Sequence, residues 1–156
     1  MKKILVISLL VFTLVAGVYG DNFKKGGKYL TGQIGLNSYA VPFGASFGLG
    51  LSSNIEVGAT LMTYLLGGWS AIQMSGDMFY HFTSLDIPVD LFAGGSIGYF
   101  TNIGGGVVYS SGIIFMPGFG ARYFLKNNLA ISLRLYFSIT KGLSGVGSIL
   151  GLTIVL

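Results

Sequence analysis

The chain has 156 residues, of which 52% are hydrophobic and only 9% are charged, and its formal net charge is +4. The nine basic and five acidic residues are scattered, which excludes the concentrated positive patch of a nucleic-acid-binding protein. Cysteine is absent, which excludes disulfides, thiolate metal sites, a cysteine nucleophile and a lipoprotein anchor.

The first twenty residues have the pattern of an export signal. Lys2 and Lys3 provide a positive start, an apolar stretch runs from Ile4 to Val15, and small residues precede a cleavage position ahead of Asp21. We expect cleavage there rather than retention as a membrane anchor. Residues 1–20 are then a cleaved signal peptide, and residues 21–156 form one domain.

A two-residue alternation dominates the rest of the chain. From Phe43 to Leu51 it reads Phe-Gly-Ala-Ser-Phe-Gly-Leu-Gly-Leu. Successive side chains of a strand point to opposite faces, so this pattern builds a sheet with one apolar face and one small or polar face. No later apolar run is long enough for a membrane-spanning helix, and a soluble sheet would need a charged surface that the chain lacks. The alternation therefore predicts a membrane β-barrel.

Eight strands of about ten residues, the length that a tilted membrane strand needs, fit the chain. They are expected at Tyr29–Leu36, Phe43–Leu51, Ile55–Leu66, Ala71–Phe82, Ile87–Phe100, Tyr109–Leu125, Leu129–Ser138 and Gly145–Leu156. The predicted fold is all-β: an eight-stranded antiparallel up-and-down transmembrane β-barrel without a free edge.

The links between strands predict the orientation. Ser52–Asn54, Thr83–Asp86 and Lys126–Asn128 read as tight polar turns, which we expect at the periplasmic end together with both chain ends. The other four links are expected to be longer on average and to face outward. They lie near Asn37–Pro42, Gly67–Ser70, Thr101–Val108 and Ile139–Ser144. Inside the sixth strand, Pro117 removes a ladder donor and predicts a β-bulge.

Side chains on the opposite parity to the lipid face are expected to fill the interior, because eight strands enclose little more than side chains. Large residues share this parity with many glycines, which predicts a largely plugged lumen. They are Tyr29, Met62, Tyr64, Phe79, Phe92, Met116 and Tyr136.

Aromatic residues near the predicted strand ends suggest interface girdles, because amphipathic rings suit the headgroup layer. The candidates are Tyr64, Trp69, Tyr80, Phe82, Tyr109, Tyr123 and Phe124.

The few charges predict an ion-pair cluster in the lumen. It comprises Glu56, Asp77, Asp90, Arg122 and Arg134, all at lumen parity. Counting across the turns places Asp77 diagonal to Asp90 and Arg122 near Arg134, while Glu56 and Arg134 are expected to meet across the barrel. Arginine forks suit carboxylate pairing, and we favour structural plugging over a gate.

The export signal, the eight alternating strands and an alternating apolar last strand resemble the small outer-membrane β-barrels of the OmpA, OmpX and OmpW type. The resemblance covers the chain from about Tyr29 onward. It implies the outer membrane of a diderm bacterium, the barrel-assembly machinery during biogenesis, and contact with the lipid bilayer and lipopolysaccharide or another outer-leaflet lipid. The family's last strand ends on an aromatic residue, whereas this chain ends on Leu156.

The main alternatives are an enzyme and a helical membrane protein. Some small outer-membrane barrels modify lipid A with a His and a Ser, but the single histidine here, His81, falls at the inner end, where we expect it to pack beside Asp90 or Ser84. Charges inside the apolar stretches argue against membrane helices. No phosphate loop or metal-ligand spacing occurs, so no cofactor is expected.

The sequence thus predicts a non-enzymatic outer-membrane barrel with a structural or surface-interaction role. Its surface partner, if it has one, is not identified by any residue pattern. A narrow channel for small or hydrophobic molecules, as resemblance to OmpW implies, is the alternative.

Overall fold

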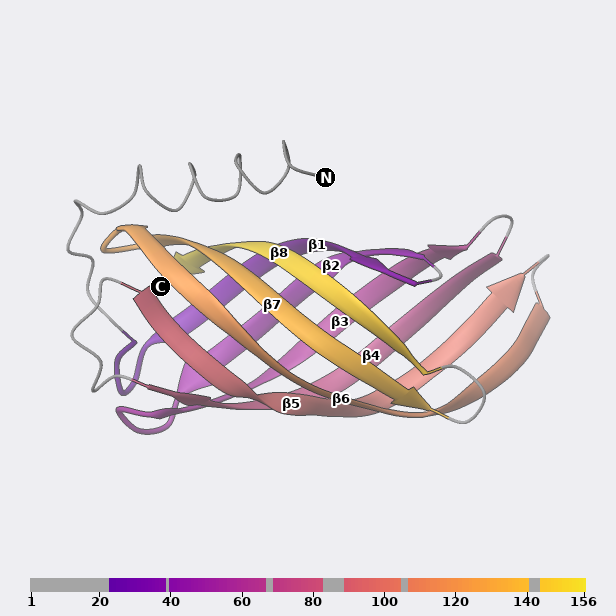
Figure 1. Ribbon diagram of the computed structural model, residues 1–156, viewed down its shortest axis with the longest axis horizontal. Helices are drawn as coiled ribbons and strands as arrows, with labels where there is room; N and C mark the ends of the chain where they lie inside the picture. The colour runs from indigo at the N-terminus through magenta and orange to yellow at the C-terminus, as the bar shows by residue number, and fades with distance from the viewer. Residues whose placement is uncertain (1–22, 39, 67–68, 83–88, 105–106, 141–143) are drawn as a thin grey trace.

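The computed structural model describes residues 23–38, 40–66, 69–82, 89–104, 107–140 and 144–156; within these, the side chains of 66, 69, 103–104 and 107–110 are left undescribed. The described residues form eight strands (Figure 1). These are β1 (Lys28–Asn37), β2 (Val41–Gly50), β3 (Ile55–Leu66), β4 (Trp69–His81), β5 (Val89–Gly104), β6 (Val107–Lys126), β7 (Leu129–Thr140) and β8 (Gly145–Val155).

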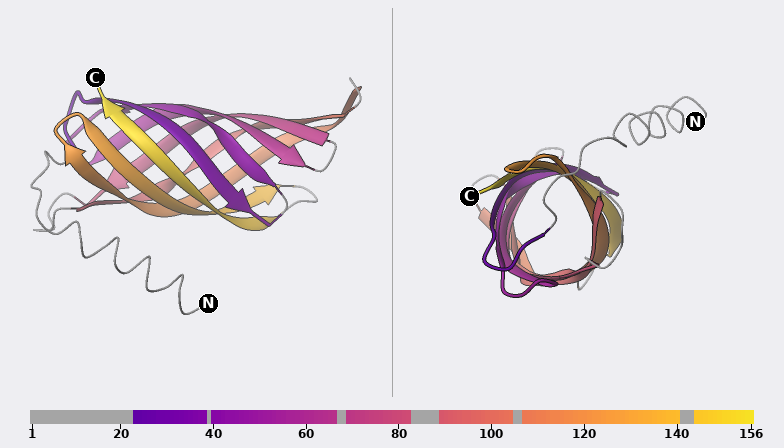
Figure 2. Two further views of the ribbon diagram at one scale, coloured as in Figure 1. Left: turned by 90° about the horizontal axis from the view of Figure 1, so that it is seen from above. Right: turned by 90° about the vertical axis from the view of Figure 1, so that its left-hand side faces the viewer.

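Each strand pairs antiparallel with its neighbours in sequence, and β1 pairs with β8, so the sheet closes into a barrel. The end-on view shows the closed ring (Figure 2). The predicted fold class is therefore confirmed. The predicted signal peptide at residues 1–20 lies outside the described residues. No helix in the described ranges is long and apolar enough to cross a membrane.

We call the end of the barrel that holds Lys28 and Val155 the inner end, and the opposite end the outer end. The expectation of longer outer links is wrong: the gaps between strands at the outer end cover only 38–40, 67–68, 105–106 and 141–144. The physical reason is that the β4–β5 and β5–β6 ladders continue toward the outer end beyond the predicted strand ends. Ile103 still pairs with Ser70 of β4, so residues expected to form a loop extend β5 and β6 instead.

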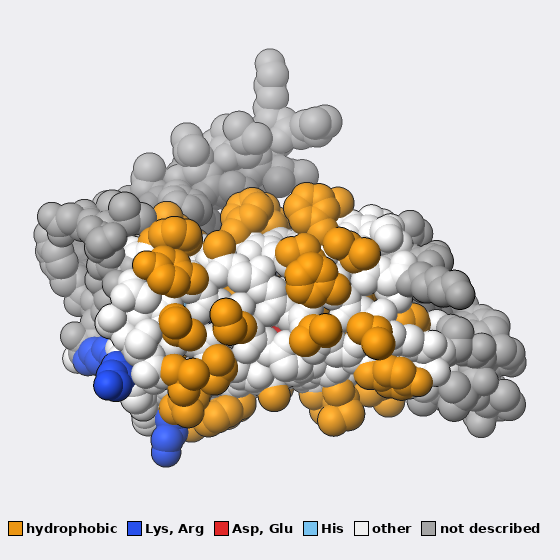
Figure 3. Space-filling model, turned by 90° about the horizontal axis from the view of Figure 1, so that it is seen from below, with side chains coloured by type: hydrophobic (Ala, Val, Ile, Leu, Met, Phe, Trp, Pro, Cys, Tyr) orange, Lys and Arg blue, Asp and Glu red, His pale blue; other side chains and the backbone are white. Residues whose placement is uncertain are grey.

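The alternation places apolar side chains on the outside, as predicted. Leu133 is 45% exposed, and its neighbours Ile131 and Leu135 on β7 are exposed in the same way, while the side chains between them point inward. On the face shown in Figure 3, apolar side chains are spread along the wall of the barrel, and the coloured Lys and Arg side chains lie at one end. Such an outer face requires an apolar surrounding, because in water it would expose hydrophobic surface around the whole barrel.

Large side chains fill the outer half of the lumen. Met62, Ile114, Met116, Tyr136 and Ile149 form a buried cluster, which we call the outer plug. Glycine makes room for it: a Cβ on Gly147 would lie 2.7 Å from Cε1 of Tyr136 and closer still to the ring's far end. The predicted pairing of large residues with glycine is confirmed here.

The bulge predicted at Pro117 is wrong. Phe115 pairs with Ile139 and Gly118 pairs with Tyr136, so the β6–β7 register is the same on both sides of the proline. The β6–β7 ladder has no pair at Met116 or at Pro117, which has no N–H to donate, while Pro117 still pairs with Gly95 of β5. Register shifts occur instead at Asn102/Ile103 and at Phe124/Lys126.

Candidate functional site

Four side chains from consecutive strands form a closed network near the inner end of the lumen, which we call the inner charged ring: Glu56, His81, Asp90 and Arg122. Arg122 Nη2 donates to Glu56 Oε2 at 3.0 Å, and His81 Nε2 lies 3.2 Å from the same oxygen. His81 Nδ1 lies 2.9 Å from Asp90 Oδ2, whose distance to Arg122 Nη1 is 3.9 Å. Acidic and basic groups thus alternate around the ring, which offsets the cost of burying each charge.

Strand register explains how these residues meet. Asp90 of β5 lies directly opposite Arg122 of β6, and His81 pairs with Phe92, which places Asp90 diagonal to His81. Glu56 extends over Gly48 of β2, where a Cβ would collide with its carboxylate. The glycine therefore gives the Glu56 side chain its path across the interior.

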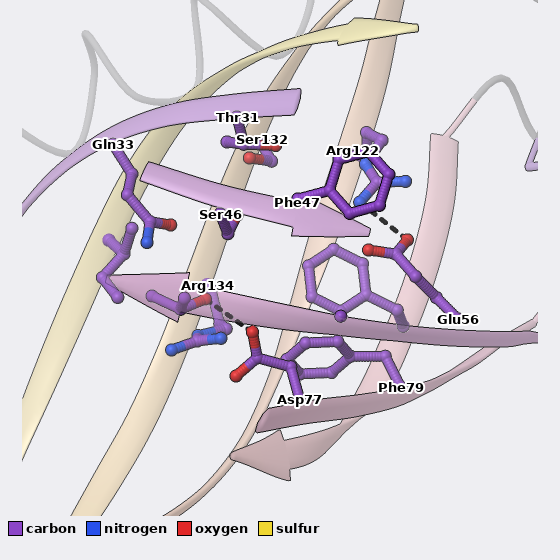
Figure 4. Close-up of a pocket in the computed structure, with 14 residues that line it drawn as sticks. Thr31, Gln33, Ser46, Phe47, Glu56, Asp77, Phe79, Arg122, Ser132 and Arg134 are labelled. Atoms are coloured by element: carbon purple, nitrogen blue, oxygen red, sulfur yellow. Dashed lines mark hydrogen bonds and ion pairs between the residues drawn. The ribbon is translucent and has the colours of Figure 1, made fainter. Parts of the chain in front are cut away.

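Within the described ranges, neither Asp77 nor Arg134 forms an ion pair with this ring. Both line an internal cavity of about 40 Å³, which Glu56 and Arg122 of the ring also line (Figure 4). Asp77 accepts hydrogen bonds from Thr60 at 2.5 Å and from Ser75 at 3.3 Å. Among the described residues, no carboxylate forms an ion pair with Arg134, and its Nε and Nη2 have no hydrogen-bond partner. Its guanidinium carbon lies 5.4 Å from the centre of the Phe79 ring. A cavity of this volume can hold about two or three water molecules, which would satisfy these donors.

The predicted five-residue cluster is therefore divided in two. The expected contact between Glu56 and Arg134 is wrong, because Glu56 pairs with Arg122 instead. The expected diagonal of Asp77 and Asp90 is also wrong, because the β4–β5 link is longer than predicted and Asp77 pairs with Ser96.

Two other placements are confirmed. Arg122 lies opposite Ser132 and Arg134 lies opposite Gly120, so the two arginines are diagonal neighbours on β6 and β7. His81 lies beside Asp90, as expected.

The inner charged ring has an aromatic cover that was not predicted from the sequence. The ring of Phe23 stacks on His81 with centroids 3.8 Å apart and planes inclined by 5°. The Tyr29 ring lies 5.3 Å from Phe23, and the guanidinium carbon of Arg122 lies 4.7 Å from the centre of the Tyr29 ring. Phe23 precedes the first strand and belongs to no alternating run, so no periodic signal identified it.

The predicted girdle is partly wrong. Tyr64 faces the lumen, where its hydroxyl donates to Gln73 Oε1 at 2.6 Å and its ring packs against the outer plug. Phe124 is buried because it shares the inward parity of Arg122.

Three of the remaining predicted girdle residues face outward, and the side chains of the other two are not described. Tyr80 and Phe82 are exposed at the inner end and meet edge to face at 5.3 Å. Tyr123 alternates with buried neighbours and points outward. The side chains of Trp69 and Tyr109 lie outside the described set.

The geometry offers little for catalysis at His81. The imidazole is 0% exposed, both of its nitrogens face carboxylates, and Phe23 covers one face, so a substrate has no approach to it. In the described part of the chain, no group of three or more His, Cys, Asp or Glu is arranged to hold a metal ion.

Comparison with known proteins gives structural neighbours only. No protein-family model matches the chain, and no curated protein matches it. The N-terminal β-barrel domain of OprF from Pseudomonas aeruginosa superimposes with a TM-score of 0.72 at 16% identity, covering 85% of this chain and 98% of that one.

Two further solved structures agree. Neisserial surface protein A gives a TM-score of 0.62 at 12% identity, covering 83% of this chain and 95% of that one. OprG from Pseudomonas aeruginosa gives 0.58 at 8% identity, covering 86% and 95%. The barrel closure, the strand number and these neighbours together show that the chain has the fold of the small eight-stranded outer-membrane β-barrels.

Proposed function

We propose that the chain is an integral outer-membrane β-barrel that acts as a structural or surface-interaction protein, without enzymatic activity and without a cofactor. The observation that carries the proposal is the filling of the lumen. The outer plug occupies the outer half, and the inner charged ring with its aromatic cover occupies the inner half, which supports a closed lumen. An interior of eight strands filled by side chains leaves no continuous water path.

Insertion into the outer membrane is part of this proposal. Residues 1–20 would direct export and be removed, and the barrel-assembly machinery would insert the remaining chain. The continuous apolar outer face supports a bilayer partner, and the closed sheet leaves no unpaired strand edge in hydrocarbon. Separation of inner and outer membranes from a producing diderm bacterium tests this: recovery in the inner-membrane fraction would contradict it.

The inner rim supports a more specific lipid partner. Lys24, Lys25, Lys28 and Lys126 are exposed there, and we call them the inner lysine collar. No acidic residue of the described ranges is exposed. Lysine ammonium groups at this depth suit anionic phospholipid headgroups of the inner leaflet. At the outer end, the described residues carry no Lys or Arg, so a basic contact to lipopolysaccharide has no support there.

Liposome swelling tests the closed lumen. Purified protein folded into vesicles should leave the uptake of small polar solutes, such as glycine and arabinose, at the rate of protein-free vesicles. A wide porin in the same vesicles provides the positive control. Swelling that rises with the amount of folded protein would contradict the proposal.

A narrow channel is the second candidate, and the internal cavity favours it. The cavity of about 40 Å³ is lined by polar groups, including Thr60, Ser132 and Arg134, in the middle of the barrel. A passage through it would require the outer plug to move. If so, uptake of small or apolar solutes should increase in a Met62→Ala variant and be measurable in the parent protein.

A further inference from the structure

The segment before β1 turns back across the inner mouth. Gly26 has φ of 77°, in the region that favours glycine, and its N–H donates to Gly50 O at 2.7 Å. Gly50 N–H donates in turn to Gly27 O at 2.9 Å, and Gly27 N–H donates to Lys24 O at 3.2 Å. Gly50 allows the close approach, since a Cβ there would collide with the Lys24 carbonyl. The backbone of 24–27 is therefore held against the end of β2.

This path places Phe23 inside the barrel. Phe23 is only 5% exposed, although it lies outside every strand. It stacks on His81 with nearly parallel planes and lies against Tyr29, whose hydroxyl accepts a hydrogen bond from Lys24 N at 2.9 Å. An apolar ring thus covers the buried imidazole of the inner charged ring, and the views of Figure 2 show the start of the described chain at this opening.

We propose that Phe23–Gly27 is a built-in plug of the inner mouth, and that seating of the Phe23 ring on His81 seals the inner charged ring and the cavity from water on the periplasmic side. The inner mouth is accordingly an aromatic-binding site whose occupant is a segment of the same chain. The backbone hydrogen bonds that join Gly26 and Gly27 to Gly50 are not part of a β-ladder, so the Phe23–Gly27 segment can leave without unpairing the strands.

The seal at the inner mouth is separate from the closed lumen of the proposed function. The outer plug blocks passage whether or not Phe23 is seated, because its members lie on β3, β6, β7 and β8 in the outer half. Removing Phe23 should therefore open the inner half to small molecules without producing a through-channel.

A direct test is the nuclear Overhauser effect between the ring protons of Phe23 and His81 in the full chain folded in lipid nanodiscs. At a centroid separation of 3.8 Å this contact should be strong, and His81 is the only histidine, so its assignment is unambiguous. Absence of the contact in a folded sample with assigned resonances would overturn the proposal. This measurement needs no substitution, so it holds even if a variant fails to fold.

A thiol reporter tests the seal. The chain has no cysteine, and Thr153 is a fully buried lumen residue. Its hydroxyl lies 2.8 Å from that of Thr31, and the Thr31–Thr153 pair lies two residue pairs deeper along the β1–β8 ladder than Tyr29 and Val155. In a Thr153→Cys protein, we expect alkylation by iodoacetamide, followed by mass spectrometry, to be slow. Adding Phe23→Ala should accelerate the alkylation by about tenfold or more. The substitution removes the ring that keeps iodoacetamide out of the inner half of the lumen.

Phe82→Ala is the matched control, since Phe82 is an exposed aromatic residue at the same end of the barrel. It should leave the alkylation rate unchanged. Gel mobility shows whether both variant barrels are folded. If they are, equal alkylation rates in the Phe23→Ala and Phe82→Ala proteins would overturn the proposal that Phe23–Gly27 plugs the inner mouth. Solute uptake by the parent protein would contradict the closed lumen instead, so the two failures are distinguishable.

Discussion

Arg122 Nη2 lies 3.0 Å from Glu56 Oε2, and this contact joins β6 to β3 across the interior of the barrel. Both side chains are buried, and both also approach other members of the inner charged ring. The ring therefore ties together four consecutive strands at the end where the barrel meets the N-terminal segment.

The Glu56–Arg122 pair should be strongly coupled. Glu56→Gln or Arg122→Gln alone leaves a buried charge without its partner, which should lower the free energy of unfolding by about 3–5 kcal/mol. The double variant should lose less than the sum of the two. Urea unfolding in lipid vesicles measures this cycle, with Ser132→Ala as a control for a lumen residue outside the ring. Additive losses would contradict the coupling.

Gly147 should not tolerate a methyl group. In Gly147→Ala the new Cβ meets the Tyr136 ring, which is already buried in the outer plug, so we expect a loss of about 1–3 kcal/mol in unfolding free energy. Gly32 is the matched control, because a Cβ there meets nothing within 4 Å. Circular dichroism measures the midpoint of thermal unfolding of the two variants. Equal decreases in this midpoint would contradict a clash between the new Cβ and the Tyr136 ring.

A charge placed on the outer face should lower the free energy of unfolding by an amount that depends on its depth in the membrane. Leu133 lies midway along β7 and Leu36 lies near the outer end of β1; both point outward. Leu133→Arg should cost about 2–4 kcal/mol in vesicles, and Leu36→Arg about 0–1 kcal/mol, because only the first arginine must enter hydrocarbon. A cost that is the same at both positions would contradict the proposed membrane position.

The inner lysine collar should make stability depend on lipid charge. With Lys25, Lys28 and Lys126 replaced by Gln, the protein should lose most of the stabilisation that phosphatidylglycerol adds over phosphatidylcholine, at about 1 kcal/mol for each lysine near an anionic surface. Unfolding midpoints in the two vesicle types measure this. The unfolding midpoint of the parent protein should rise in phosphatidylglycerol. An equal rise in the variant would show that the inner lysine collar does not cause it.

The strands were predictable because lipid on the outside and a narrow lumen on the inside together impose a two-residue alternation on each strand. Ile55–Leu66 is predicted and observed with the same bounds, since apolar residues alternate with small or polar ones from Ile55 to Leu61. The outer extensions of β5 and β6 were missed, because residues such as Thr101 and Asn102 are common in loops, while the ladder to β4 that keeps them extended is a long-range contact.

The site was only partly predictable. Parity placed all five charged residues in the lumen, but which carboxylate meets which arginine depends on register, and the longer β4–β5 link moved Asp77 away from Asp90. Phe23 was missed for a different reason. Its position depends on the left-handed turn at Gly26 and on stacking with His81, and neither has a periodic signature.

Single-channel recording in a planar bilayer tests the central claim most directly, because it detects any continuous path through the lumen. With the parent protein inserted, we predict no steady current, since the proposed function has the outer plug and the inner charged ring close the barrel from both ends. A reproducible steady conductance of the folded parent protein, scaling with the number of insertions, would contradict the account.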